Sequence, residues 1–301
     1  MLAIIVPYYK LTFFEDTLRS LASQTDKRFK VYIGDDASPE NCALLLDKYK
    51  GTFDFVYKKF ETNLGGISLV KQWERCIAFI GNEEWIMILG DDDFISPNLV
   101  ESFYAHYEKF ASKSQLIRFA KQNIFKKTGA SMEIQYNPEF ESASDAFYRR
   151  ITGGTTITLS EYIFKRSSYE KYGFYSYPLA WHSDNRAWIE FAEEKPIYSI
   201  NEAVVTVVNS ELSISGSSLF SHQKNQASIA FYRYLMEEKL PSFSKQQAIR
   251  VIHKYENAIS RVRKISIKDR LFLFPYYVKN YEPNSFKSNL KKIVKSVFNI
   301  Q

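Results

Sequence analysis

The stretch WIMILGDDDFISP, residues 85–97, joins a continuous apolar run to three consecutive aspartates, Asp91–Asp93. A short apolar run that ends abruptly is typical of a strand buried on both faces of a sheet. Three carboxylates at the end of such a strand repel one another and are costly to remove from water. A divalent cation, often bound together with a phosphate, offsets that cost, so the cluster predicts a metal–diphosphate site. The alternative interpretation is a solvated acidic turn ahead of a helix.

Outward from this stretch, apolar runs alternate with helical patterns over the first third of the chain. Strands are predicted at 2–6, 29–34, 53–57 and 84–89. Strands that alternate with helices of about 10–15 residues indicate βαβ units, and so an α/β fold with a mostly parallel sheet. Polar residues follow three of these strands, namely Pro7-Tyr8-Tyr9, Asp35-Asp36 and Asp91–Asp93. Because ligands bind outside the carboxyl ends of parallel strands, the three groups together predict one binding site.

The first strand-to-helix turn, VPYYK at 6–10, lacks glycine. A dinucleotide-binding fold needs glycines there so that the pyrophosphate can reach a helix N-terminus. No Walker-type phosphate loop occurs either. The sequence therefore argues against a dehydrogenase and against a P-loop enzyme, and the acidic cluster becomes the candidate for holding phosphate.

After about residue 115 the pattern changes. Strands are expected at 116–125, 134–136 and 157–164, an extended segment at 197–208, and helices at 143–151, 181–193, 219–239 and 244–265. We expect a domain at 1–215, with a nucleotide-binding half at 1–112 and an acceptor half at 113–215. Residues 216–301 would form a basic helical C-terminal extension.

The chain has 301 residues, of which 45% are hydrophobic and 16% aromatic, and this excludes a disordered protein. No apolar run approaches the roughly 20 residues that span a bilayer, and the N-terminus is typical of a first strand, not of a signal peptide. Cys42 and Cys76 are too few and too far apart for a disulfide framework or a zinc site. These features favour a reducing, cytoplasmic setting.

The positive charge is concentrated near the C-terminus. Residues 250–301 contain twelve Lys/Arg and three acidic residues. Lys291, Lys292 and Lys295 flank Ile293, Val294, Val297 and Phe298 in an amphipathic pattern. Such a surface can lie on the inner face of an anionic membrane, which predicts a peripheral contact. The alternative is a solvated helix that packs on the domain; nucleic acid is disfavoured because no binding module is recognisable.

Four motifs in this order resemble those of family-2 glycosyltransferases with the GT-A fold: IVPYY at 5–9, GDDAS at 34–38, NLGG at 63–66 and GDDDFISP at 90–97. The resemblance covers about residues 1–210. It implies a Rossmann-like nucleotide-diphospho-sugar transferase fold and inverting transfer that depends on Mn²⁺ or Mg²⁺. It also implies a nucleotide-sugar donor and a glycan acceptor, with lipid-linked surface polysaccharide (O-antigen or capsule type) as the expected product.

The resemblance also implies roles for individual residues. Residues that follow the first two strands would hold the nucleotide, namely Pro7, Tyr8, Tyr9 and Asp36, and the turn with Asn63 and Gly65 would lie beneath it. An aspartate that accepts from a base N–H makes a charge-assisted hydrogen bond. The alternative role of Asp36 is a turn residue ahead of Ser38-Pro39.

The family pattern in the acidic cluster is Asp-X-Asp, and its register here is ambiguous. Counted back from Pro97, the first expected aspartate falls on Gly90 and the metal-coordinating one on Asp92. We therefore expect Asp92 to ligate the metal directly, with Asp93 helping to orient the metal site. Asp91 would face the ribose or a metal-bound water.

An inverting transfer needs a general base that deprotonates the acceptor hydroxyl. Asp184, in WHSDN at 181–185, fits the position where the family places this acid. Its alternative role is a helix N-terminal acid. His182 is a rival base or a partly exposed loop histidine, and Trp181 is either a sugar-stacking or a core residue. The motifs leave two other functions open: a non-catalytic nucleotide-sugar or polysaccharide-binding protein, and a nucleotidyltransferase, although the latter class typically has a glycine-rich, basic first loop.

Overall fold

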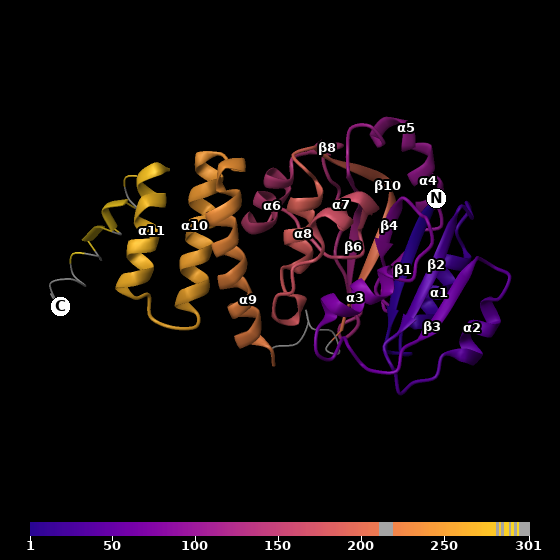
Figure 1. Ribbon diagram of the computed structural model, residues 1–301. Helices are drawn as coiled ribbons and strands as arrows, with labels where there is room; N and C mark the ends of the chain where they lie inside the picture. The colour runs from indigo at the N-terminus through magenta and orange to yellow at the C-terminus, as the bar shows by residue number, and fades with distance from the viewer. Residues whose placement is uncertain (211–218, 281–282, 284–285, 289, 292–293, 295–301) are drawn as a thin grey trace.

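The computed structural model describes residues 1–210, 219–280, 283, 286–288, 290–291 and 294. Within them a ten-stranded mixed sheet has its main strands in the order β3-β2-β1-β4-β9-β6-β10-β5. Figure 1 shows the sheet and its flanking helices on one side of the molecule and α9–α11 extending away from it. The predicted α/β class with a C-terminal helical region is confirmed.

The first half of the sheet is parallel, as the alternation of apolar runs predicts. It contains β1 (Leu2–Tyr8), β2 (Phe29–Asp35), β3 (Phe55–Lys59) and β4 (Trp85–Ile88). These strands pair in parallel, and the helices between them are α1 (Phe14–Ala22), α2 (Ala43–Tyr49) and α3 (Leu69–Ile77). Their carboxyl ends therefore meet at one edge of the sheet.

The second half of the sheet mixes directions. β9 (Tyr162–Lys165) is antiparallel to both β4 and β6 (Leu116–Phe125), whereas β6 is parallel to β10 (Ile197–Asn209). Three further pairings in this half are short and antiparallel: β5 (Phe94–Ile95) with β10, β7 (Ala130–Ser131) with β6, and β8 (Phe140–Glu141) with β10.

Two predicted strands are wrong in extent. Of 134–136 only a single bridge, between Gln135 and Lys121, is formed. The strand predicted at 157–164 begins only at Tyr162, because the preceding residues fold around a buried charge. Glu161 accepts a hydrogen bond from the Thr158 N–H and pairs with the buried Lys121, and this requires a loop.

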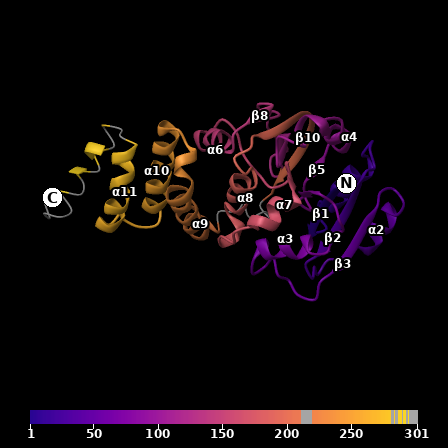
Figure 2. The ribbon, with the colours of Figure 1, turned by 45° about the horizontal axis from the view of Figure 1, so that its top comes forward.

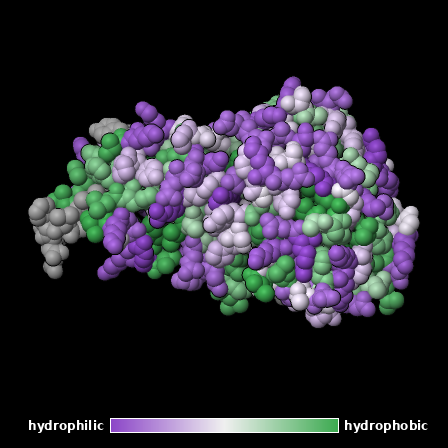
Figure 3. All heavy atoms as spheres, viewed as in Figure 1, coloured by the Kyte–Doolittle hydropathy of each residue, from purple (hydrophilic) through white to green (hydrophobic). Residues whose placement is uncertain are grey.

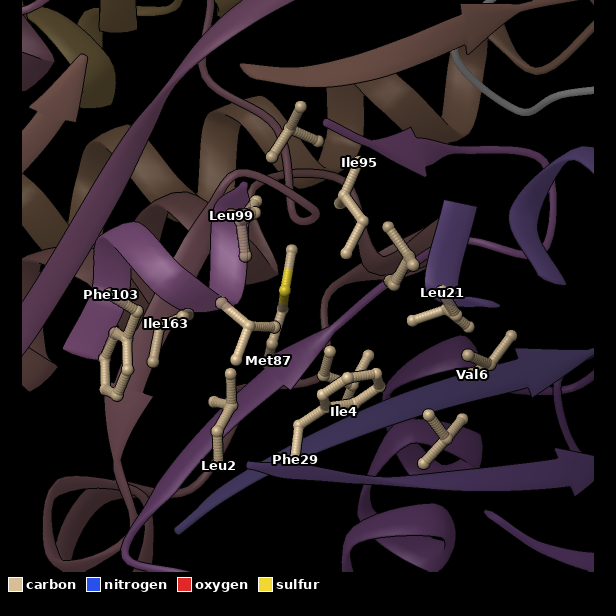
Figure 4. Packing of buried hydrophobic residues seen from close by; sticks show 14 of the residues in the cluster. Leu2, Ile4, Val6, Leu21, Phe29, Met87, Ile95, Leu99, Phe103 and Ile163 are labelled. Atoms are coloured by element: carbon tan, nitrogen blue, oxygen red, sulfur yellow. The ribbon is translucent and has the colours of Figure 1, made fainter. Parts of the chain in front are cut away.

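Two apolar clusters cover the two faces of the sheet. Figure 4 shows one of them, in which Ile4 and Val6 of β1 pack with Met87 of β4, Leu21 of α1 and Leu99 of α4 (Leu99–Ala105). All five side chains are fully buried. Burying an aliphatic side chain of this size contributes about 1.5–3 kcal/mol, so this cluster fixes the strand ends that carry the site.

A third apolar cluster joins the C-terminal helices to the rest of the molecule. The helices concerned are α6 (Ala143–Thr152), α9 (Ser221–Tyr234), α10 (Lys245–Ser260) and α11 (Ile267–Lys279). The helix predicted at 219–239 is α9 followed by a π-helical turn, Leu235–Lys239. Figure 2 shows α6 and α8 (Ser183–Phe191) between the sheet and α9–α11. The other helices are α5 (Tyr107–Phe110) and α7 (Arg166–Tyr172).

Among the described helices none is long and apolar enough to cross a bilayer. Cys42 and Cys76 are both buried free thiols.

Candidate active site

A cavity of about 590 Å³ opens where β1, β2 and β4 end. Pro7 of β1 and Tyr9, directly after β1, line the cavity, Asp36 follows β2, and Asp91–Asp93 follow β4. Asp184, at the start of α8, lines the same cavity. The structure thus brings together carboxylates that lie up to about half the chain apart in the sequence.

Asp91 holds the loop after β1. Its Oδ2 accepts hydrogen bonds from the backbone N–H of Tyr9 at 2.8 Å and of Lys10 at 2.9 Å. Burial raises the pKa of Asp91, and these two hydrogen bonds oppose that rise. Asp91 therefore fixes the loop that carries Tyr9, and no other described residue donates to its Oδ1.

Asp93 joins three parts of the sheet. Its Oδ2 accepts from the Ser160 hydroxyl at 2.5 Å, and its Oδ1 accepts from the Val208 N–H at 2.9 Å. The side chain is buried, and burial raises its pKa to about 6. Because protein donors occupy both oxygens, the structure favours a positioning role for Asp93.

Asp93→Ala should destabilise the protein by about 2–4 kcal/mol, because it leaves the buried N–H of Val208 and the Ser160 hydroxyl without an acceptor. Asp92→Ala is the matched control, since no described residue donates a hydrogen bond to Asp92 from elsewhere in the chain. Urea unfolding with a chelator present measures both. Equal losses of unfolding free energy in the two variants would show that Asp93 has no special structural role.

Asp92 differs from its neighbours. No other described residue donates a hydrogen bond to its carboxylate. Burial, and then the charges of Asp93 and Asp91, raise its pKa to about 8. A Cβ built on Gly90 would lie 3.0 Å from Asp92 Oδ1 and 3.0 Å from Asp93 Oδ2, so glycine at this position makes room for both carboxylates.

These residues fit a divalent cation. Asp92 offers carboxylate oxygens to which no other described residue donates, in a cluster whose mutual repulsion a cation would relieve. In the described part of the chain no three His, Cys, Asp or Glu side chains converge on one point as a metal cage. Mg²⁺ sites commonly use only one or two carboxylates and complete the shell with substrate phosphates and water.

Asp36 organises the turn after β3. Its Oδ1 accepts from the Leu64 N–H and its Oδ2 from the Gly65 N–H, both at 2.7 Å. Arg75 of α3 donates to Oδ1 at 2.5 Å. Asn63 fixes the same turn by accepting from the Gly66 N–H at 2.6 Å. Asp36 therefore stabilises a turn, but the turn begins 28 residues further along the chain and is not the one ahead of Ser38-Pro39. Asp36 also lines the cavity.

Gly65→Ala should destabilise the protein by about 1–3 kcal/mol, as overpacking typically does. The added Cβ would lie 2.5 Å from Asp36 Oδ2, which hydrogen bonds hold in place. Gly154→Ala is the control, because its Cβ would come no closer than 3.3 Å to another atom, the Cγ of Arg149. Thermal or urea unfolding measures the difference, and equal stability of the two variants would contradict this packing.

The Tyr8 side chain points to the opposite side of the strand from those of Pro7 and Tyr9. Pro7 and Tyr9 line the cavity, whereas the Tyr8 ring is fully buried against Phe14 and donates from its hydroxyl to the Glu40 carbonyl. Successive side chains of a strand point to opposite faces, so Tyr8 supports the cavity wall from the core. Its side chain does not line the cavity.

Asp184 combines a held oxygen with an open one. Its Oδ1 accepts from the backbone N–H and the side-chain Nδ2 of Asn185, at 2.7 and 2.6 Å. No described residue donates to Oδ2. Burial raises the pKa of Asp184, and the positive charge of Arg150 opposes that rise. An oriented carboxylate with a raised pKa is a stronger base than an ordinary aspartate.

His182 is buried, in contrast to the partly exposed loop histidine considered above. It caps α8 and stacks on Phe231 with 4.5 Å between ring centroids. The Ser228 hydroxyl donates to the Lys224 carbonyl, so Nε2 of His182 must be the donor in its 3.0 Å contact with Ser228. Burial and Arg150 lower the pKa of His182 well below its ordinary value, which makes it a weaker base than an ordinary histidine.

The other residues considered as site candidates lie in different parts of the structure. Trp181 lines the cavity, and the Lys224 ammonium lies 4.8 Å from its ring centroid. Gly153 ends α6 in a left-handed conformation, with φ of 89°, so it turns the chain. The family resemblance also predicts that a polar segment with Asn209, Ser213 and Ser215 closes over the donor. Asn209 is the last residue of β10, and Ser213 and Ser215 lie outside the described residues.

Sequence reasoning missed three residues that shape the site. They are Arg75, which holds Asp36; Ser160, which holds Asp93; and Arg150, which lines the cavity and acts on Asp184. Basic residues in a helix are usually solvated, so neither arginine gives a signal in the sequence. Ser160 could be found only with the loop before β9 in place.

Comparison with known proteins agrees with this geometry. The family model described as glycosyl transferase family 2 matches residues 3–173, more than half of the chain. No significant match is found among curated proteins by sequence. The structure is similar to that of S. aureus TarS 1-349 in complex with UDP-GlcNAc, at a TM-score of 0.61 and 16% identity over 93% of this chain and 89% of that one.

The structure of this chain is also similar to that of GalNAc-T7 with UDP, GalNAc and Mn²⁺. The TM-score is 0.57 and the identity 11%, over 100% of this chain and 57% of that one. At these identities the two structures establish the GT-A fold, and the family model covers all four motifs in full. The chain belongs to glycosyl transferase family 2.

Proposed function

We propose that this glycosyltransferase moves a sugar, with inversion, from a nucleotide-sugar donor to a hydroxyl of an acceptor glycan. The proposal rests on one cavity that holds both Asp92, to which no other described residue donates a hydrogen bond, and an oriented Asp184. The solved structures with UDP-GlcNAc and with UDP and Mn²⁺ support a nucleotide-sugar donor and a divalent metal.

Asp184 would accept the proton of the attacking hydroxyl through its open Oδ2, while Asn185 keeps the carboxylate oriented. The hydroxyl then attacks the anomeric carbon from the side opposite the leaving nucleoside diphosphate, through an oxocarbenium-like transition state. Asp92 would hold the metal, and Asp91 and Asp93 would position the loops around it. When bound, Mn²⁺ or Mg²⁺ neutralises charge on the departing diphosphate.

Pro7, Tyr9, Asp36, Asn63 and Gly65 would form the nucleotide end of the cavity. All five line it. Tyr8 would contribute from behind the wall, and Asp91 would lie between the nucleotide and the metal. Residues 1–112 would then be the nucleotide-binding half, 113–215 the acceptor half, and 216–301 the basic extension.

The acceptor is proposed to be a lipid-linked surface polysaccharide, and the protein to work on the cytoplasmic side with peripheral membrane contact. Leu271 and Val278 of α11 are exposed apolar residues beside Lys268 and Lys279, and Figure 3 shows hydrophobic (green) spheres gathered over α11. Lys292, Lys295 and most of the amphipathic stretch lie outside the described residues; Lys291 and Val294 are exposed. Apolar and basic side chains together favour an anionic membrane surface.

A donor screen tests the proposal. The protein is incubated with a panel of nucleotide-sugars, with Mn²⁺ or with chelator, and release of nucleoside diphosphate and glycosylated product is measured. We expect release with one donor class that requires the metal. Nucleotide binding without turnover of any donor would instead support the alternative, a non-catalytic binding protein on the same fold.

A further inference from the structure

Basic side chains form a stripe along α10. Arg250, Lys254 and Arg261 follow one another at intervals of four and seven residues, and at about 100° per residue these positions share one face of a helix. Arg250 and Arg261 are exposed, and Lys254 is half-buried. The stripe is about 16 Å long, because eleven residues at about 1.5 Å each separate its two arginines.

Arg150 connects this stripe to the catalytic cavity. It lies in the last turn of α6, whose Phe147 and Ile151 share an apolar cluster with Val251 and Tyr255 of α10. Arg150 also lines the cavity. Burial and then Arg250, Arg150 and Arg261 lower the pKa of Lys254, so the four cations lie within electrostatic reach of one another.

This cluster lacks the carboxylates that other arginines of the same region have. Arg186, Arg233 and Arg263 each pair with an acidic residue, at 3.1, 2.9 and 2.5 Å. None of the four clustered cations forms such a pair within the described residues. The α6 carboxylate that meets α10, Asp145, accepts from Ser142 and Gln247 instead. Arg150 acts on Asp184 at the cavity, but the like charges along α10 have no paired carboxylate, and a bound anion would relieve their repulsion.

The geometry points to an acceptor-binding track for phosphate groups, which starts at Arg150 beside the cavity and runs along α10 through Lys254 to Arg250 and Arg261. It rests on the proposed function, in which the acceptor hydroxyl reaches Asp184. Guanidinium groups bind phosphate oxygens in a bidentate manner, and the length of the track suits phosphates repeated along a ligand. Two sources share this chemistry: a soluble phosphodiester chain and the diphosphate headgroup of a lipid carrier.

Binding of two probes to the full-length protein tests the track. The first is a fluorescent glycerol-phosphate oligomer, and the second is phosphatidylcholine vesicles with and without a prenyl diphosphate. R250Q/R261Q should weaken binding roughly tenfold, as expected for the loss of two exposed ion pairs, and added salt should shrink the difference. R250K/R261K should restore most of the binding. The control K109Q/K113Q removes two exposed lysines of the α5 region and should bind as the wild type does.

Weakened binding of the oligomer alone assigns the phosphate to a soluble chain, and weakened binding of the vesicles alone assigns it to a lipid headgroup; both results support the track. Equal affinity in wild type and R250Q/R261Q, or an equal loss in K109Q/K113Q, would overturn it. Nucleoside diphosphate binding with Mn²⁺ is measured in parallel. If the wild type does not bind a nucleoside diphosphate, the proposed function is refuted. If it does bind one, but R250Q/R261Q binds the two probes as the wild type does, only the track is refuted.

Discussion

Asp92→Asn should lower kcat/KM for sugar transfer on the order of a thousandfold. The amide keeps the shape of the side chain but cannot neutralise a cation, and loss of one such electrostatic group typically has an effect of this size. The fold should be unaffected, because no other described residue donates a hydrogen bond to Asp92. The measurement is the initial rate of product formation over a range of Mn²⁺ concentrations.

The same assay on Asp91→Asn and Asp93→Asn settles the register of the Asp-X-Asp motif. We expect both to retain more activity than Asp92→Asn when assayed at a temperature where they remain folded. One amide oxygen can replace Oδ2 of Asp91, which accepts from both Tyr9 and Lys10. At position 93 it can replace only one of the two oxygens that accept from Ser160 and Val208. Wild-type rates in Asp92→Asn, with loss in one of the other two, would move the direct metal ligand to that residue.

Asp184→Asn should lower kcat by about a hundredfold to ten-thousandfold, the usual contribution of a general base, with little change in donor affinity. Asparagine still offers an oxygen to the Asn185 N–H, so the start of α8 should keep its geometry. Single-turnover rates with saturating donor measure the chemical step. His182→Asn is the comparison, because asparagine tolerates the left-handed backbone at this position, where φ is 74°.

The pH dependence gives the same test a second readout. Burial raises the pKa of Asp184, and only the deprotonated carboxylate accepts a proton, so kcat should rise with pH through that elevated pKa. Asp184→Asn should lose this rise, whereas His182→Asn should keep it. A pH profile that is unchanged in Asp184→Asn but flattened in His182→Asn would identify His182 as the base.

Local patterns predicted the parallel half of the sheet because three of its four strands are apolar runs that end in a polar group. They could not predict what holds the acidic cluster. Asp93 accepts hydrogen bonds from Ser160 and Val208, which lie 67 and 115 residues away in the sequence. Such contacts form only when the whole sheet is assembled. Tyr8 shows a second limit: β1 continues through it, so the alternation of the strand turns its ring into the core.

Buried charged residues were the hardest part of the structure to predict from the sequence. Lys121 and Glu161 form a buried pair 40 residues apart, and that pair shortens the predicted strand before Tyr162. Arg150 ends a helix in the way that solvated basic residues often do. Its place beside Asp184 depends on how α6 and α8 pack, which no periodicity encodes.

Asp92 is proposed to hold the metal that binds the nucleoside diphosphate. Calorimetric titration of nucleoside diphosphates tests this role most directly. Wild type and Asp92→Asn are each titrated with Mn²⁺ present and with the metal chelated. We predict binding of one nucleoside diphosphate to the wild type that requires Mn²⁺ and is lost or strongly weakened in Asp92→Asn. Equal affinity in all four titrations would contradict the claim.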